Sequence, residues 1–68
     1  MDLQAYLEKT GMSQTEFAKA IQMTQSAVSK YVLKRRVPSP KIIYRIVAAT
    51  SGEVGVEDML YEYDGKNE

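Results

Sequence analysis

Few side chains in this sequence have the types and spacing that catalysis or metal binding requires. The chain contains no cysteine and no histidine, so it lacks thiolate ligands and the commonest general base. Two pairs of acids, Glu57 with Asp58 and Glu62 with Asp64, have neither the spacing nor the glycine of a calcium-binding loop. We therefore expect no enzyme activity, no bound metal and no cofactor.

Another group of polar side chains suits recognition better than catalysis. At helical spacing, one side of residues 25–33 carries amides, hydroxyls and a single charge: Gln25, Ser26, Ser29 and Lys30, with Leu33 beyond them. The exposed side of a merely solvated helix more often carries pairs of glutamate and lysine. This side of the segment is therefore a candidate binding surface.

The charges of the chain cancel overall but are divided unevenly along it. Residues 1–52 hold eight Lys or Arg and three acids, a net charge of +5, whereas residues 53–68 hold six acids and Lys66, a net charge of −5. A polyanion would be attracted to the first part and repelled by the second. The densest positive cluster is Lys34, Arg35 and Arg36, directly after the candidate surface.

The 68 residues are enough for one domain only. A domain of this size buries roughly 60% of the surface that its unfolded chain exposes, so a bound partner would add useful stability. No apolar run approaches the ~20 residues that span a bilayer, and residues 1–9 lack the pattern of a signal peptide. We expect a cytoplasmic protein with one domain at residues 1–61 and a frayed acidic tail at residues 62–68.

Apolar spacing and helix caps predict an all-α chain. The expected helices span residues 2–9, 14–21, 25–33, 40–50 and 56–61. Ser13 and Glu16 have the spacing of a capping box before the second helix. Thr24 is a suitable N-cap for the third helix, and Ser39 followed by Pro40 suits the start of the fourth.

Residues 14–33, QTEFAKAIQMTQSAVSKYVL, hold two of these helices and the turn between them. Ala18 supplies a small side chain where the helices would cross closely. Apolar side chains that would lock one helix across the other are Phe17, Ile21, Met23, Val28 and Tyr31. The segment resembles the helix-turn-helix of the phage Cro and lambda-repressor-like families, which implies a five-helix, lambda-repressor-like domain that binds operator DNA. Those families usually have glycine where Gln22 stands, since the turn tends to require a positive φ.

The resemblance also implies roles for individual residues. The second helix of the motif would enter the major groove and read base edges with its exposed side chains. Carried over to this sequence, the base-reading residues are Gln25, Ser26, Ser29 and Lys30, and the phosphate contacts are Gln14, Lys34, Arg35, Arg36 and Lys41. Glutamine can pair with adenine through two hydrogen bonds, and lysine can bond guanine O6 and N7. Gln14 also begins a helix, where backbone amides suit a phosphate.

A second copy of the chain is the expected protein partner. One helix reads only a few base pairs, so two copies on a palindromic operator, with half-sites about 34 Å apart, would give sufficient selectivity. The expected contact is an apolar and aromatic patch in the acidic C-terminal part, made of Met59, Leu60, Tyr61 and Tyr63. Packing of this patch onto its own chain is the alternative.

Two of these interpretations have rivals. Ser51-Gly52 also suits a two-residue hairpin turn, which would give an α+β, Cro-like fold with strands within residues 42–57. We favour the helix because its 3.6-residue period is cleaner. For function, we expect a Cro-like repressor in a bacterial host. An antitoxin-like or activating regulator would use the same DNA-binding module, and a protein-interaction domain would use the fold without DNA.

Overall fold

Side-chain hydrogen bonds cap three of the four α-helices within residues 1–61; Ser39 precedes the fourth, with Pro40 at its first position, but the Ser39 side chain forms no capping hydrogen bond. In the computed structural model, which describes residues 1–61, Thr24 Oγ1 accepts a hydrogen bond from Ala27 N at 3.1 Å. Ser13 and Glu16 form the predicted capping box, in which each side chain accepts from the other residue's amide at 3.0 Å. The α-helices of this part of the chain are α1 (Leu3–Thr10), α2 (Gln14–Ala20), α3 (Gln25–Val32) and α4 (Pro40–Ala49), and a 3₁₀ helix, η1 (Val56–Met59), follows them.

Left-handed backbone conformations make the turns between these helices. Gln22, between α2 and α3, has a φ of 60°, which confirms the conformation predicted for that position. Lys34 after α3 and Ser51 after α4 have φ values of 59° and 54°. A residue other than glycine pays roughly 1 kcal/mol for this conformation. Packing between the helices must therefore hold these three turns in place.

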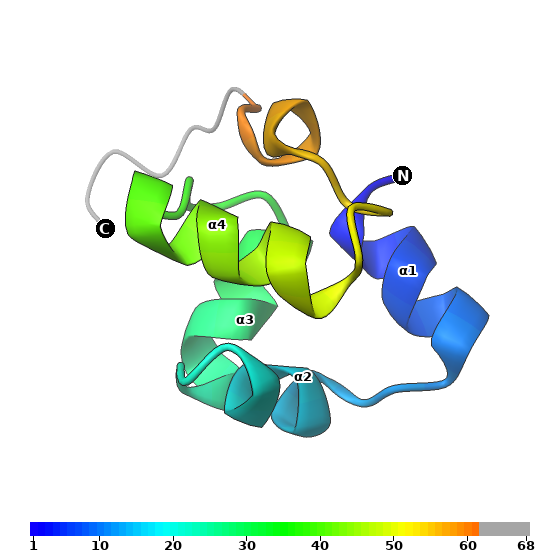
Figure 1. Cartoon of the computed structure of the whole chain (residues 1–68). Coiled ribbons are helices and arrows are strands. Elements are labelled where there is room, and N and C mark those ends of the chain that lie inside the picture. The colour runs from blue at the N-terminus through cyan, green and yellow to red at the C-terminus, as the bar shows by residue number, and fades with distance from the viewer. Residues whose placement is uncertain (62–68) are drawn as a thin grey trace.

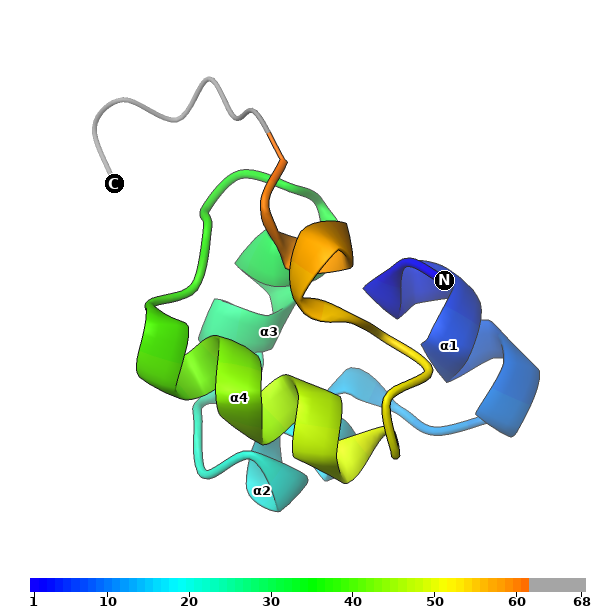
Figure 2. The ribbon, with the colours of Figure 1, turned by 45° about the horizontal axis from the view of Figure 1, so that its top comes forward.

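The helices surround one core rather than stacking in layers. α2 packs against α3, α1 packs against α3, and α4 lies in front of α3, with α2 below both (Figure 1). After rotation, η1 is seen between α4 and the start of α1 (Figure 2). The Met1 ammonium joins these parts because it donates to Glu53 O at 2.9 Å and to Asp58 Oδ2 at 3.1 Å.

The predicted inner faces of the helices meet in this core. Its buried apolar side chains are Leu3, Tyr6, Leu7, Phe17, Ala18, Ile21, Val28, Tyr31, Ile42, Ile43, Ile46, Val54 and Met59. The rings of Tyr6 and Phe17 meet edge to face, with centroids 6.2 Å apart. Thr50 is buried among these side chains and is satisfied, since its hydroxyl donates to Val47 O at 3.2 Å and accepts from Val54 N at 3.1 Å.

The alternative hairpin within residues 42–57 is wrong. α4 continues to Ala49, and no residue between 1 and 61 lies in a strand. Ser51 and Gly52 end the helix, and Gly52 N donates back to Val47 O at 2.9 Å. Helical spacing lets α4 bury Ile42, Ile43 and Ile46 together, whereas a strand would put neighbouring side chains on opposite faces.

The expected fifth helix is only partly present. Helical structure covers Val56–Met59 instead of residues 56–61 and is of the 3₁₀ type, so residues 1–61 contain four α-helices. Gly55 N donates to Asp58 Oδ2 at 2.9 Å; this bond and the Met1 ammonium lower the pKa of the Asp58 carboxyl. The predicted frayed tail, residues 62–68, lies outside the described residues. None of the helices within residues 1–61 is long and apolar enough to cross a membrane.

Candidate nucleic-acid interface

Two glutamines meet where α2 and α3 begin. Gln25 Nε2 donates a hydrogen bond to Gln14 Oε1 at 2.8 Å, and Gln25 remains exposed. The bond leaves Gln14 with an amide NH₂ that can still donate, and Gln25 with a carbonyl oxygen and a second N–H. The crossing of the two helices therefore brings together one residue predicted to contact phosphate and one predicted to read bases.

The remaining polar residues of α3 extend this surface along the helix. Gln25, Ser29 and Leu33 follow one another at intervals of four, and Ser26 and Lys30 form the adjoining row. Ser26 and Leu33 are exposed, whereas Ser29 and Lys30 are half-buried. The opposite side of α3 buries Val28 and Tyr31 in the core. All four predicted base-reading residues thus share the outer side of α3, which we call the polar face (Gln25, Ser26, Ser29 and Lys30).

The positive cluster forms a turn at the other end of α3, which we call the basic turn (residues 34–36). Its backbone folds back on the helix, with Lys34 N donating to Tyr31 O at 3.1 Å and Arg35 N to Lys30 O at 2.9 Å. Arg35 and Arg36 have exposed side chains, and within residues 1–61 neither forms an ion pair. Both guanidinium groups are therefore available to a polyanion.

Lys34 differs from its two neighbours because its side chain makes contacts within the chain. Its Nζ lies 4.0 Å from Asp2 Oδ2 and 5.9 Å from the centroid of the Tyr61 ring. Asp2 also caps α1, because its Oδ1 accepts from Ala5 N at 2.8 Å. The prediction of a phosphate contact was the same for all three cations of the basic turn, but the structure gives Lys34 contacts within its own chain.

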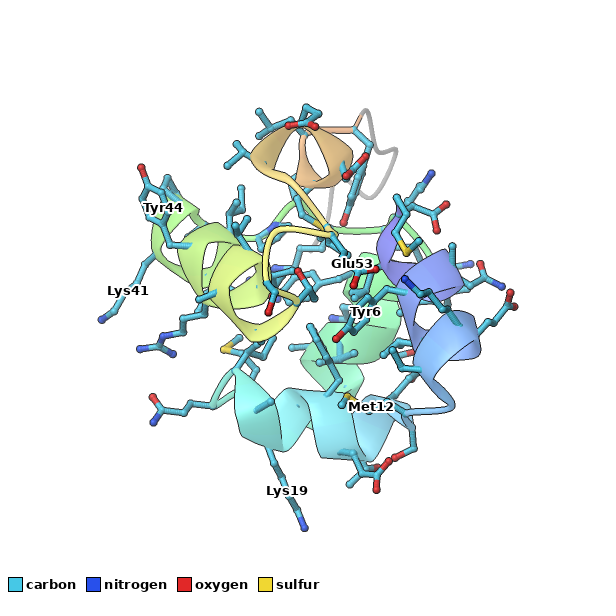
Figure 3. All side chains as sticks on the ribbon, turned by 45° about the vertical axis from the view of Figure 1, so that its right-hand side comes forward. Tyr6, Met12, Lys19, Lys41, Tyr44 and Glu53 are labelled. Atoms are coloured by element: carbon cyan, nitrogen blue, oxygen red, sulfur yellow. The ribbon has the colours of Figure 1, made fainter. Side chains whose placement is uncertain are left out.

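Lys41 stands apart from the other predicted phosphate contacts. It lies in the first turn of α4, is exposed, and projects outward on the same side as Tyr44 (Figure 3). Lys19 projects outward from α2 in the same view. Within residues 1–61, no hydrogen bond or ion pair joins Lys41 to the basic turn or to Gln14.

Arg45 contacts the C-terminal end of α2, beside the candidate interface, although sequence reasoning assigned it no role. It is half-buried on α4, and its Nη1 donates to Ile21 O at 3.3 Å, at the C-terminal end of α2. A cation at this end of a helix satisfies an otherwise unpaired carbonyl. The contact also adjoins Gln22, whose positive φ sets the turn between α2 and α3. The sequence signal that could have identified this contact is the charge of Arg45 within the otherwise apolar pattern of α4.

The residues predicted to form the dimer contact have different surroundings. Met59 is fully buried in the core of its own chain, so its side chain is not available to a partner. Leu60 is 60% exposed and lines an apolar groove of about 240 Å³ with Pro40, Ile43, Tyr44 and Val56. Tyr63 lies outside the described residues. Met59 therefore packs within its own chain, as the alternative predicted. The dimer contact of Leu60 remains a prediction.

Tyr61, the other member of that patch, is half-buried against the basic turn. Its hydroxyl oxygen lies 2.5 Å from Arg36 O and 3.2 Å from Tyr31 O, so its one proton is shared between these two acceptors, with Arg36 O the nearer. Burial, with a smaller effect of Tyr31, raises the pKa of Tyr61 to about 12. The hydroxyl therefore keeps its proton, and its donor function, at neutral pH.

Comparison with known proteins agrees with this geometry. Neither the curated proteins nor the solved structures gave a significant match. A family model described as helix-turn-helix matches residues 3–52, which is 50 of the 68 residues and includes α1 to α4. That range contains the polar face, the basic turn and the glutamine pair. The chain thus belongs to the helix-turn-helix family of DNA-binding regulators of the Cro and lambda-repressor type.

Proposed function

We propose that this protein is a Cro-like transcriptional repressor that binds a palindromic operator as a dimer. The observation that carries the proposal is the Gln14–Gln25 pair at the exposed start of α3. A hydrogen bond between two solvent-accessible glutamines adds little stability to the fold, but it orients both amides. Orientation of an amide matters where its donors and acceptors must match those of a base.

The pair connects the DNA backbone to a base edge. Gln25 keeps one acceptor and one donor, which is the pattern needed for the two hydrogen bonds to adenine N6 and N7. Gln14 keeps its NH₂ for a phosphate oxygen, so a backbone contact would fix the position from which Gln25 reads. Ser26, Ser29 and Lys30 continue the reading along the groove, and Lys30 suits guanine O6 and N7.

The basic turn supplies attraction without selectivity. Arg35 and Arg36 are the exposed cations of the turn, and arginine can bind phosphate through two hydrogen bonds. Lys34 and Lys41 are also exposed and add positive potential. Each phosphate neutralised contributes about −0.9 to the slope of log K against log[salt].

The dimer would use a surface that the monomer leaves apolar. Tyr44, Val56 and Leu60 are 70%, 41% and 60% exposed around the apolar groove. A second copy is the partner because a two-fold palindrome requires protomers related by a two-fold axis, and such an axis makes the same surface face itself. Exposed Lys41 and Glu57, next in sequence to lining residues, supply both signs of charge for a self-complementary rim.

Selection of binding sites from a random pool of duplexes tests the whole proposal. We expect recovered sites to be two-fold symmetric, with half-sites about 34 Å apart, and bound by two chains. A gel-shift titration should then show binding to the recovered site at least about 10³ times tighter than to random DNA. Equal affinity for both DNAs would contradict sequence-specific binding, and no binding to either would favour the protein-interaction alternative. A reporter carrying the site should lose transcription under a repressor and gain it under an activator.

A further inference from the structure

Tyr61 joins the C-terminal part of the described residues to the basic turn. Met59 is fixed in the core, and the next residue, Leu60, is exposed. Tyr61 then returns to the body of the protein, where its hydroxyl reaches the carbonyl oxygens of Tyr31 and Arg36. These carbonyls lie on the two sides of the basic turn.

We infer that Tyr61 is a positioning residue, whose hydroxyl holds the basic turn in the conformation that presents Arg35 and Arg36 to phosphate. The inference rests on the proposed function and names a residue 25 positions from the turn that it controls. Tyr61 lies beyond residue 52, where the family match ends, so it is a feature of this chain outside the matched region.

The turn needs such a constraint because of its backbone. Lys34 has a φ of 59°, a conformation that a residue other than glycine leaves easily if nothing holds it. The hydrogen bonds of Lys34 N and Arg35 N secure the side of the turn that joins α3. On the exit side, the 2.5 Å contact between Tyr61 Oη and Arg36 O is the hydrogen bond that restrains the chain before residues 37–39 lead into α4.

The Tyr61 ring makes a second contact with the same turn. Lys34 Nζ lies 5.9 Å from the ring centroid, and Asp2 Oδ2 lies 4.0 Å from the same ammonium. These contacts draw the Lys34 side chain toward Tyr61 and the start of α1. Lys34 is thus held by contacts within its own chain, whereas Arg35 and Arg36 are exposed and form no ion pair within residues 1–61.

Tyr61→Phe isolates the hydroxyl, since phenylalanine keeps the ring and its contact with Lys34. We expect roughly fivefold weaker binding to the selected site and to random duplex alike, the effect of one lost hydrogen bond on groups that contact phosphate. The matched control is Tyr6→Phe, because Tyr6 lies in the core, away from the proposed DNA and dimer surfaces, and its hydroxyl forms no hydrogen bond within residues 1–61. Binding should be measured at a temperature at which circular dichroism shows every variant folded.

A double-mutant comparison separates positioning from a general effect on the fold. In a chain with Arg35→Ala and Arg36→Ala, Tyr61→Phe should weaken DNA binding no further, because the groups that it positions are gone. A further fivefold loss in that background would overturn the inference. Nitrogen-15 relaxation of the free protein supplies a second measurement: order parameters of the Arg35 and Arg36 amides should fall in Tyr61→Phe and not in Tyr6→Phe.

The arginine variant also distinguishes failure of the inference from failure of the proposed function. If replacing both arginines leaves DNA affinity unchanged, the basic turn does not contact phosphate. That result would overturn the role of Tyr61 and the part of the proposed function that assigns phosphate contacts to this turn. If that replacement weakens binding but Tyr61→Phe leaves affinity and order parameters as in the wild type, only the role of Tyr61 is overturned.

Discussion

The first residues of α3 and the turn that follows its last residue lie at opposite ends of the same helix and carry different chemistry. At the start, Gln25 and Ser26 offer neutral donors and acceptors, and Gln25 is held by Gln14. At the end, Arg35 and Arg36 carry full charges on a turn whose exit is held by the Tyr61 hydroxyl. Neutral groups distinguish one base pair from another but attract DNA weakly, whereas cations attract any duplex. We therefore infer that selectivity and affinity come from opposite ends of one helix.

The largest effect should come from the neutral end. Gln25→Ala would remove both hydrogen bonds that we propose Gln25 makes to adenine, and it is expected to cost roughly 1–3 kcal/mol on the selected site, with much less loss on random DNA. Gel-shift titrations on both duplexes measure the difference. Gln4→Ala, the same change at an exposed position of α1, is the control and should leave both affinities unchanged. Equal losses on the two DNAs would make Gln25 a backbone contact and remove the distinction between the ends of α3.

The charged end should behave in the opposite way. Arg35→Ala is expected to weaken binding to selected and random DNA equally, by roughly 1.5 kcal/mol. It should also flatten the slope of log K against log[salt] by about 0.9, because one phosphate contact is lost. Lys9→Ala removes the same charge from α1, where Lys9 pairs with Glu53, and should leave the slope nearly unchanged. A slope that stays the same in Arg35→Ala would place this residue outside the interface.

Sequence reasoning predicted the contacts between residues close together in the chain and missed the contacts between distant residues. The capping box of Ser13 and Glu16 and the cap at Thr24 involve residues three apart, so their pattern is visible in the sequence. The positive φ of Gln22 followed from its place in the motif. The Gln14–Gln25 bond depends on how two helices cross, and the Tyr61 contacts span 25 and 30 residues. Neither is determined by spacing alone.

The C-terminal segment shows why the same pattern can have two meanings. Met59 and Leu60 are neighbouring apolar residues in an acidic stretch, and both were predicted to contact a second copy of the chain. The 3₁₀ turn of η1 sends Met59 into the core and leaves Leu60 outside. A periodicity read over four residues is too short to assign inner and outer faces, so the sequence indicated an apolar patch without dividing it.

The neutral end of α3 should also lose stability when its own cap is removed. Thr24→Ala deletes the oxygen that accepts from Ala27 N, and the free energy of unfolding should fall by about 1 kcal/mol. Urea denaturation followed by circular dichroism measures this change. Thr15→Ala, at an exposed position inside α2, is the matched control and should cost less. Equal losses in the two variants would mean that the start of α3 is held by its packing and not by its cap.

The smallest expected effect is a dependence on alkaline pH that only the charged end should show. Burial raises the pKa of Tyr61 to about 12 from an ordinary value of 10.0, so the folded chain keeps this proton more tightly than the unfolded chain does. Stability from Tyr61 is therefore complete below about pH 10 and is lost as pH rises through about 12. Because solvent reaches part of the ring, we expect a loss of at most about 1 kcal/mol.

Urea denaturation of wild type and Tyr61→Phe across this pH range measures the loss. The advantage of the wild type should shrink with rising pH, while the difference between wild type and Thr24→Ala should stay constant, because no titrating group forms that cap. A wild-type advantage over Tyr61→Phe that is the same at every pH would show that the exit of the basic turn does not depend on the Tyr61 proton.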